Sequence, residues 1–457
     1  MASEKNNIIV GLDIGTTKIC VIVGQLAENG KINILGVGKA SSQGGVSRGM
    51  VANVNKVVSA IEEAVKEAEK VTQIKINTVY VGIAGHHIKS IQHRGTLTRR
   101  NGEEEILAEE LQGLESEMEN LALSPGLEIL HVLPQDYKID GEDGIRDPIG
   151  RIGVRVECNY HIITGETSRA KTIGRAVHNA GLKVADLVVE PVASSSAVLS
   201  DPEREAGVAL VDIGGGTTDV CVFENGYIIH TAIIPIGGDR ITKDLQEAFG
   251  ILKDQAEEVK IKYGNCVPSE TMRNEVVVIP GLPGRQSKEI SLYAIAQVIK
   301  ARMEDIIQRV DFEIQTSGIA DKLNGGLVLT GGGSGLKDVS QLFAFYTALD
   351  VHIGSPGRYL GRGMIDEVRN PMYSTAIGLV MLGIEEEIKI GCEFEPNKPI
   401  SESTPENEEV VLEGEVFEKQ EEQKPTQKPS WKPTIYSSIG GFFKGLVMDD
   451  SDDFIKN

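Results

Sequence analysis

The most constraining feature of this chain is a short motif that occurs twice. Residues 11–23 read GLDIGTTKICVIV, and residues 210–223 read LVDIGGGTTDVCVF. In both copies an apolar strand pattern reaches an Asp, a Gly- and Thr-rich turn follows, and a second strand pattern begins. One such turn alone could equally be a tight hairpin or an anion-binding nest. Two matched copies favour a functional site.

The similarity of the two copies extends beyond the turns. Each copy continues as strand, turn, strand and then helix, with helices expected at about 52–70 and from about residue 240 onward. The copies lie about two hundred residues apart, which is too far for a solenoid repeat and is typical of two related α/β domains facing each other across a cleft. Residues 84–160 and 241–325 lack the pattern. We expect them to be insertions into the first and second domain.

The paired turns have the chemistry of a polyphosphate site. Backbone N–H groups in such turns converge on an anion, and glycines leave no Cβ between the backbone and a phosphate. Threonine hydroxyls add donors, and Lys18, present only in the first turn, would supply a point charge. Two facing turns would hold the phosphates from both sides. The predicted phosphate-binding residues are Gly15, Thr16, Thr17, Lys18, Gly214, Gly215, Gly216, Thr217, Thr218 and Gly238.

The strand that precedes each turn ends in a carboxylate, Asp13 or Asp212. Two hard carboxylates beside a polyphosphate suit Mg²⁺, held through its waters because Mg²⁺ dehydrates reluctantly. We therefore predict these two residues as metal-site residues. Alignment of the motifs places Asp219 where the first turn has Lys18, so the two turns are related but not equivalent.

Three further segments are candidates for the rest of the site. The turn LTGGGSGL would let a nucleoside approach its glycines, and the helix DQAEEVKIKYG offers a carboxylate and an amine on one face; a merely solvated helix stays an alternative. Glu190 ends a strand and starts a helix with Pro191, where it could orient a water; a structural helix start is equally open. The predicted adenosine-binding residues are Gly331, Gly332, Gly333, Glu257 and Lys260.

Other patterns exclude functions. GETSRAKT at 165–172 resembles a P-loop, but Ala170 replaces a required glycine and no strand of sufficient length is evident before it; we expect a helix with a buried face. The net charge of −21 argues against nucleic-acid binding. No signal peptide and no apolar run near the ~18 residues of a membrane span are evident, so we expect a cytosolic chain.

The motifs DIGTTK, DIGGGTTD and LTGGGS resemble the phosphate-1, phosphate-2 and adenosine motifs of the actin/Hsp70/sugar-kinase superfamily. Within it, the segments GGVSRGMVANVNKVVSAIEEAVKEAE, VYVGIAGHHIKS and PIGGDRITKDLQEAFGILKDQAEEVKIKYG are similar to those of the FtsA family of bacterial cell-division proteins. The resemblance covers roughly residues 7–390. It implies an actin-like ATPase fold, in which two related RNase H-like α/β domains surround a nucleotide cleft, with an FtsA-type subdomain 1C insertion.

The resemblance also implies the cofactors ATP and Mg²⁺ and a set of partners. Such proteins form actin-like filaments, bind the C-terminal tail of the tubulin-like protein FtsZ through subdomain 2B, here 241–325, and act at the cytoplasmic side of the inner membrane at the division septum. Later division proteins would bind subdomain 1C, 84–160. Glu190 matches the position of the water-orienting residue, although turnover is often slow. The implied bounds are 7–83 and 161–200 for 1A, 84–160 for 1C, 201–240 and 326–391 for 2A, and 241–325 for 2B.

The C-terminal part reads as a linker and a membrane-binding tail. Residues 393–424 hold eleven Asp or Glu against three Lys, and we expect 392–430 to be a disordered acidic linker. Residues 431–457 carry an apolar stripe at helical spacing, interrupted by three glycines and followed by the acidic run DDSDD. A protein-docking segment is the alternative. The predicted membrane-contacting residues are Trp431, Ile435, Ile439, Phe442, Phe443 and Leu446.

Two alternative functions stay open. A sugar kinase or Hsp70-type ATPase is disfavoured because residues 392–457 are too short and polar for a substrate-binding β domain and no dedicated catalytic Asp of a kinase is evident. A PilM-type pilus-assembly ATPase would share the first domain and its insertion. The long acidic linker and apolar tail favour the FtsA-type function, since a tether needs reach.

Overall fold

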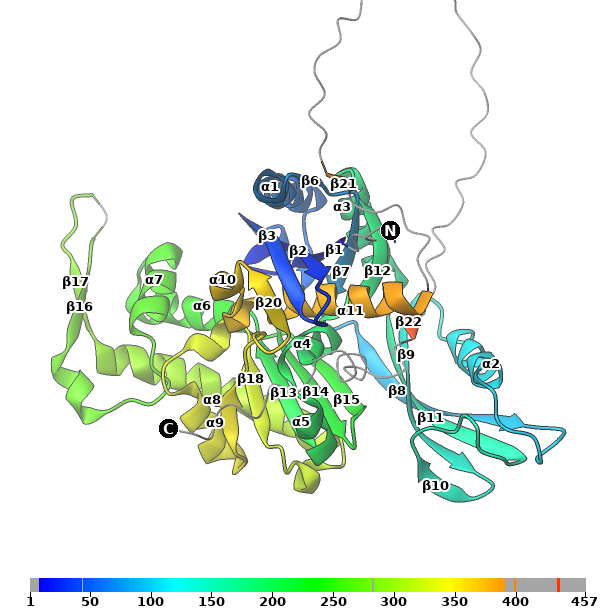
Figure 1. The fold of residues 1–457 in the computed structure, drawn as a ribbon. Helices are drawn as coiled ribbons and strands as arrows, with labels where there is room; N and C mark the ends of the chain where they lie inside the picture. The colour runs from blue at the N-terminus through cyan, green and yellow to red at the C-terminus, as the bar shows by residue number, and fades with distance from the viewer. Residues whose placement is uncertain (1–7, 43, 282, 391–397, 400–433, 436–457) are drawn as a thin grey trace, which may run out of the picture.

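The computed structural model describes residues 8–42, 44–281, 283–390, 398–399 and 434–435 of the 457-residue chain. Two sheets form the centre of the molecule, and a third sheet projects to one side (Figure 1). Each central sheet begins with three consecutive antiparallel strands and receives its parallel strands later in the chain. The predicted pair of related α/β domains is confirmed.

The first sheet has the order β12-β7-β1-β2-β3-β20. Its central strands are buried along nearly their whole length, as expected of a sheet covered on both faces. Helix α1 packs over Gly38 and helix α11 over Gly24, and these two glycines lie on opposite faces of the sheet. The elements are β1 (Ile8–Ile14), β2 (Lys18–Leu26), β3 (Ile32–Ser41), α1 (Val54–Thr72), β7 (Thr78–Ile83), α3 (Thr167–Asn179), β12 (Lys183–Val189), α4 (Glu190–Val198), β20 (Leu360–Gly363) and α11 (Ser374–Ile390).

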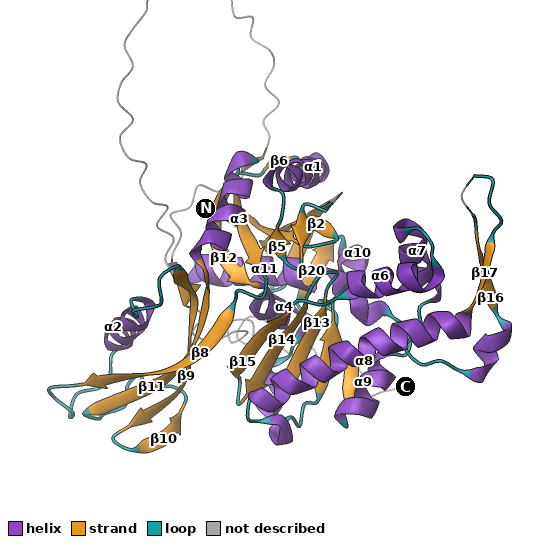
Figure 2. Cartoon of the chain, turned by 180° about the vertical axis from the view of Figure 1, so that it is seen from behind, coloured by secondary structure: helices purple, strands orange, loops and turns teal. Residues whose placement is uncertain are grey.

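The second sheet has the order β15-β14-β13-β18-β19. The long helix α8 lies across one face of it (Figure 2), and its buried residues share a core with the strands. Helix α7 and the hairpin β16–β17 lie within the predicted second insertion, and helix α6 begins three residues before it. The elements are α5 (Asp201–Ala206), β13 (Val208–Ile213), β14 (Thr218–Glu224), β15 (Tyr227–Ile234), α6 (Gly238–Phe249), α7 (Lys253–Tyr263), β16 (Val276–Ile279), β17 (Lys288–Ser291), α8 (Leu292–Thr316), β18 (Leu327–Thr330), α9 (Val339–Thr347) and β19 (Val351–Ile353).

The first insertion forms its own sheet, β10-β9-β11-β8, with a separate apolar core under helix α2. It enters the chain between β7 and α3, so it hangs from the first domain while its base also contacts β15 of the second. The elements are β8 (Lys89–Thr98), α2 (Ala108–Glu119), β9 (Leu127–Ile139), β10 (Glu142–Ile145) and β11 (Arg155–Glu166).

The structure differs from the sequence-based expectation in two places. Residues 360–390 fall in the predicted range 326–391 of the second domain, yet β20 pairs with β3 and α11 packs on β1, so they complete the first domain. Local periodicity identifies such a helix but does not reveal which core it joins. The strand judged absent before GETSRAKT is present as β11. The predicted helical face of that segment is confirmed, because Ala170 and Ile173 of α3 are buried.

Two short stretches of the C-terminal part are described. Lys398 and Pro399 form β21, paired with β6 (Ile74–Lys75), and Thr434 and Ile435 form β22, paired in parallel with β9. The backbone at Ile435, the first residue of the predicted apolar stripe, is therefore extended. The other predicted membrane-contacting residues lie outside the described residues. Within the described part, no helix is both long and apolar enough to span a membrane.

Candidate functional site

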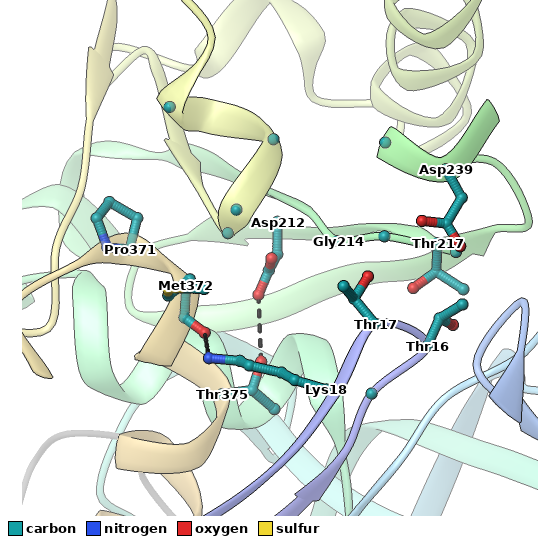
Figure 3. Close-up of a pocket in the computed structure, with 18 of the residues that line it drawn as sticks. Thr16, Thr17, Lys18, Asp212, Gly214, Thr217, Asp239, Pro371, Met372 and Thr375 are labelled. Atoms are coloured by element: carbon teal, nitrogen blue, oxygen red, sulfur yellow. Dashed lines mark hydrogen bonds between the residues drawn. The ribbon is translucent and has the colours of Figure 1, made fainter. Parts of the chain in front are cut away.

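A cavity of about 410 Å³ lies between the two central sheets, and both Gly/Thr turns line it (Figure 3). Apart from Thr218, every residue predicted for phosphate, metal, adenosine or water contacts lines this cleft. They are Asp13, Gly15, Thr16, Thr17, Lys18, Glu190, Asp212, Gly214, Gly215, Gly216, Thr217, Gly238, Glu257, Lys260, Gly331, Gly332 and Gly333.

The two turns contact each other across the cleft. A Cβ added at Gly215 would lie 2.1 Å from Thr17 Oγ1, and one added at Gly216 would lie 2.3 Å from Thr16 Oγ1. The threonines of the first turn therefore occupy the space that the second turn leaves by lacking side chains. This interlocking brings the backbones of both turns to one shared space, as a two-sided anion site requires.

The strand register corrects the alignment of the two motifs. Asp13 pairs with Cys20, and Asp212 pairs with Asp219. Asp219 therefore stands where the first domain has Cys20, and it is Thr217 that takes the place of Lys18. The repeated Thr-Thr letters misled the alignment, because backbone pairing, not residue identity, sets equivalence in a hairpin.

Thr218 does not line the cleft, contrary to expectation. It is the first residue of β14 and is fully buried, and its hydroxyl donates to the Ile236 carbonyl oxygen at 2.8 Å. Successive side chains of a strand point to opposite faces, so Thr217 and Asp219 face the cleft whereas Thr218 points away from it.

Four carboxyl groups converge on the cleft floor. Burial raises the pKa of Asp13 to about 6, although Lys18 opposes this shift and Asp212 adds to it. Burial and the neighbouring aspartates raise the pKa of Glu190 and of Asp219 well above their usual range. Burial also raises the pKa of Asp212, but this carboxylate accepts hydrogen bonds from Ser194 Oγ at 2.6 Å and Thr375 Oγ1 at 3.3 Å, which stabilise the charged form.

Lys18 is held at one side of the cleft by the chain segment that precedes α11. Its ammonium donates to the Met372 carbonyl oxygen at 2.9 Å and lies 3.7 Å from the centre of the Tyr373 ring (Figure 3 shows the first contact). Burial lowers the pKa of Lys18, while the nearby carboxylates raise it. An incoming anion can therefore replace the Met372 carbonyl oxygen as the hydrogen-bond acceptor of Lys18.

The third Gly-rich turn closes the cleft next to Asp212. Gly331 has φ +81°, and a Cβ there would lie 2.1 Å from Asp212 Oδ1. A side chain at this position would collide with the carboxylate, so glycine is required for both reasons. Across the cleft, Lys260 Nζ contacts Glu257 Oε2 at 2.7 Å and the Gly238 carbonyl oxygen at 3.2 Å. Glu257 and Lys260 of helix α7 therefore hold each other in place at the cleft.

Several lining residues have no counterpart in the sequence-based prediction. Asp219 was recognised only for its motif position, and the segment 370–375 was not predicted at all. Its Asn370 caps a short helical turn by accepting a hydrogen bond from the Met372 N–H at 3.0 Å. An Asn-Pro pair before an apolar helix is a detectable turn signal, but nothing local connects it to the cleft. The unpredicted lining residues are Gly49, Asp219, Asp239, Ile261, Gly335, Leu336, Asn370, Pro371, Met372 and Thr375.

The donor set fits a hard cation held jointly with an anionic ligand. Asp219 Oδ1 is buried without a hydrogen-bond partner, and carboxylate oxygens are the donors that such cations prefer. Among the described residues, no group of three or more His, Cys, Asp or Glu side chains is arranged to hold a metal ion by itself. A cation here would therefore take part of its coordination from the ligand and from water.

Solved structures with similar folds define the class of protein. The chain aligns over 82% of its length with a structure titled "PilM-PilN type IV pilus biogenesis complex", covering 98% of that chain at TM-score 0.60 and 17% identity. It aligns over 84% of its length with MreB5 of Spiroplasma citri bound to ADP, covering 98% of that chain at TM-score 0.51 and 13% identity. The predicted fold is confirmed: the chain has the actin-like ATPase fold, a class built around a nucleotide cleft.

Sequence relatives define the family within that class. The family model for "Cell division protein FtsA" matches residues 209–378, and the model for the "SHS2 domain inserted in FTSA" matches residues 85–164. The chain is 37% identical to the FtsA of Pseudomonas aeruginosa over 85% of its length and 92% of that protein. It is 38% identical to the FtsA of Neisseria meningitidis over 88% of its length and 94% of that protein. The chain belongs to the FtsA family of cell-division proteins.

Proposed function

We propose that this chain is an ATP-binding, actin-like cell-division protein that polymerises at the cytoplasmic face of the inner membrane. There it anchors FtsZ filaments and helps to assemble the septal ring. The observation that carries the proposal is the interlocked pair of phosphate-binding turns above four carboxyl groups. Membership of the FtsA family supplies the cellular context.

The lining residues divide into roles around a bound Mg²⁺–ATP. The facing turns would hold the β- and γ-phosphates, and Lys18 would neutralise them in place of its contact with the Met372 carbonyl oxygen. Asp13 and Asp212 would hold the cation through its waters, and the glycines of the third turn would admit the adenosine. Glu257 and Lys260 would contact the ribose and the base edge. Bound Mg²⁺ supplies charge neutralisation to the phosphates.

Glu190 is placed to orient a water toward the terminal phosphate. It lies at the first turn of α4, beside Asp13 and Asp219 on the cleft floor. Burial and the neighbouring aspartates raise its pKa, and a nearby cation would oppose that shift. We propose that ATP binding, with turnover at most slow, is the function of the site.

The Asp212→Asn variant tests the nucleotide site. It removes the negative charge but keeps the side-chain size and the acceptor for Ser194. We expect Mg²⁺-dependent ATP affinity to fall at least about tenfold, the equivalent of 1.4 kcal/mol, because a metal-site carboxylate is lost. Calorimetric titration with and without Mg²⁺ measures this. Unchanged Mg²⁺-dependent affinity in a folded variant would refute the placement of the cation.

The proposed partners belong to separate parts of the chain. Residues 241–325 bind the FtsZ C-terminal tail, residues 84–160 contact later division proteins, and residues 431–457 bind the membrane. Filaments form by self-association of the body. Electron microscopy of the chain with ATP on a lipid monolayer tests the last two points together, and failure to form filaments would remove the polymer from the proposal.

A PilM-type pilus-assembly ATPase is the second candidate, favoured by the fold similarity to the PilM–PilN structure. Pull-down with an FtsZ C-terminal peptide separates the two. We expect retention of the full chain by this peptide and none by a scrambled peptide. Equal retention by both peptides would count against the FtsZ partnership and reopen the second candidate.

A further inference from the structure

A second cavity, of about 610 Å³, lies where the inserted sheet meets the second domain. One wall is a run of five consecutive residues of β8, Ser90 to Arg94, and the other includes Ile229 and His230 of β15. The cavity therefore follows the backbone of β8. None of its lining residues is Asp or Glu, although the chain as a whole has a net charge of −21.

Strand β8 is the edge of the inserted sheet. It pairs with β11 on one side, and no described strand pairs with its other side. An edge strand presents unpaired N–H and C=O groups, which proteins normally shield. The facing edge of β15 is shielded: Gln92 Nε2 donates to the Ile229 carbonyl oxygen at 2.8 Å, and Gln135 Nε2 donates to that of Ile228 at 2.5 Å. Within residues 93–98 of β8, only Gly95 is buried and Leu97 is half-buried, whereas the other residues are exposed.

The open edge is also basic. Residues 89–100 contain four Lys or Arg and one His and no acidic residue. Arg99 is used internally, since its guanidinium is buried and contacts Glu110 and backbone carbonyl oxygens. Arg94 reaches Asn159 and Glu157, yet 58% of its side chain is exposed, and His93 is exposed beside it. The edge therefore fits an extended segment that carries carboxylates.

The chain contains a segment with these properties. Residues 408–418 read EEVVLEGEVFE, with five Glu, no Lys or Arg, and three Val, a Leu and a Phe. Valine and phenylalanine favour strands, and the glutamates complement the basic edge. The segment can reach β8, because Thr434 pairs with β9 of the same sheet. The sixteen steps from 418 to 434 span up to ~50 Å, whereas β9 and β8 are only ~10 Å apart.

We propose that residues 408–418 dock as an added strand on the open edge of β8, with glutamates facing Arg94 and His93 and one end entering the acid-free cavity. The inserted subdomain then holds the acidic part of the C-terminal segment. This docking shortens the free segment between residue 418 and Thr434, which pairs with β9. The docking does not depend on the proposed membrane function.

Hydrogen–deuterium exchange on the full chain in lipid-free buffer tests the docking. We expect the outward-facing amides of His93 to Thr98 to exchange at least tenfold more slowly in the wild type than in the Glu413→Lys/Glu415→Lys variant. The control variant Glu421→Lys/Glu422→Lys carries the same change of charge outside the segment and should exchange like the wild type. Arg94→Glu should also lose protection, and its combination with Glu413→Lys/Glu415→Lys should restore it.

Equal exchange of these amides in the wild type and in Glu413→Lys/Glu415→Lys would overturn the proposal. So would protection that rises with protein concentration, since a second copy would then supply the strand. Loss of protection in both the test and the control variant would show an unspecific charge effect and would overturn it as well. Because no lipid or nucleotide is present, these outcomes do not depend on whether the chain binds membranes or ATP.

Discussion

At the scale of single residues, the cleft brings four carboxyl groups together. Burial is the largest cause of the raised pKa of Asp13, Asp212, Asp219 and Glu190, and Lys18 opposes that shift at the first two. A bound divalent cation favours the charged form of a carboxyl group and so opposes these shifts. We therefore expect nucleotide affinity to depend on pH.

The Asp13→Asn variant tests this view. The folded pKa of about 6 lies above the ordinary 3.8, so this carboxyl group contributes stability below about pH 4 that is lost as pH rises through 6. We expect the nucleotide-free wild type to be less stable at about pH 7.5 than at about pH 5, and Asp13→Asn to remove on the order of 1–1.5 kcal/mol of that difference. Urea unfolding in EDTA at both pH values measures it.

The exposed Asp143 supplies the matched control for this variant. Its side chain is 69% exposed and lies far from the cleft in the inserted sheet. Asp143→Asn should leave the pH dependence of unfolding as in the wild type. If Asp13→Asn also leaves it unchanged, the pKa of Asp13 does not govern the stability of the empty cleft.

At the scale of elements, sequence periodicity predicts where helices and strands lie far better than it predicts which elements pack or pair with one another. The valines and isoleucines of 52–70 predicted a helix, and α1 buries Val57, Ile61 and Val65. The turns likewise fall where the Gly/Thr letters placed them. The equivalence of Asp219 with Lys18 failed, however, because strand register depends on backbone hydrogen bonds that the letters do not encode.

The crossing of α4 and α11 gives a prediction at this scale. A Cβ at Gly378 would lie 1.8 Å from the Ala193 carbonyl oxygen, so the two helices touch through their backbones. We expect Gly378→Ala to lower the free energy of unfolding by about 2–3 kcal/mol through overpacking. The helical Gly174 has no neighbour within 4 Å of its added Cβ. Gly174→Ala should instead be neutral or stabilise by ~0.5–1 kcal/mol.

Urea denaturation of the two glycine variants decides this prediction. Similar stabilities for Gly378→Ala and the wild type would mean that the helices can separate at little cost. In that case α11 would be less firmly part of the first domain than its buried face indicates. A loss of stability in Gly174→Ala as well would point to a general intolerance of added methyl groups in these helices.

At the scale of the whole molecule, the proposed function gives the body and the C-terminal segment different tasks. Burial of the large apolar side chains of 431–457 in a membrane could contribute up to roughly 10 kcal/mol before ordering costs. Glycines and the DDSDD run weaken a single tail, so we expect stable attachment only when a filament presents many tails.

Liposome co-sedimentation of the full chain and of a 1–430 truncation tests this expectation. The full chain should pellet with anionic liposomes in the presence of ATP, and the truncation should stay in solution while still binding ATP. Asp212→Asn, which should not polymerise with ATP, should pellet less than the wild type. Equal pelleting of the full chain and the truncation would exclude the tail as the membrane anchor.

The sequence by itself determined the two related α/β domains, the cleft between them and most of its lining. The reason is that each phosphate-binding motif joins two strands, so a repeated motif implies a repeated set of strands. Only the tertiary structure decided that 360–390 complete the first domain, that Thr218 turns away from the cleft, and that four residues before and at the start of α11 line it, Asn370, Pro371, Met372 and Thr375. These features depend on contacts between residues far apart in the chain. Local patterns of hydrophobicity and turn residues do not contain that information.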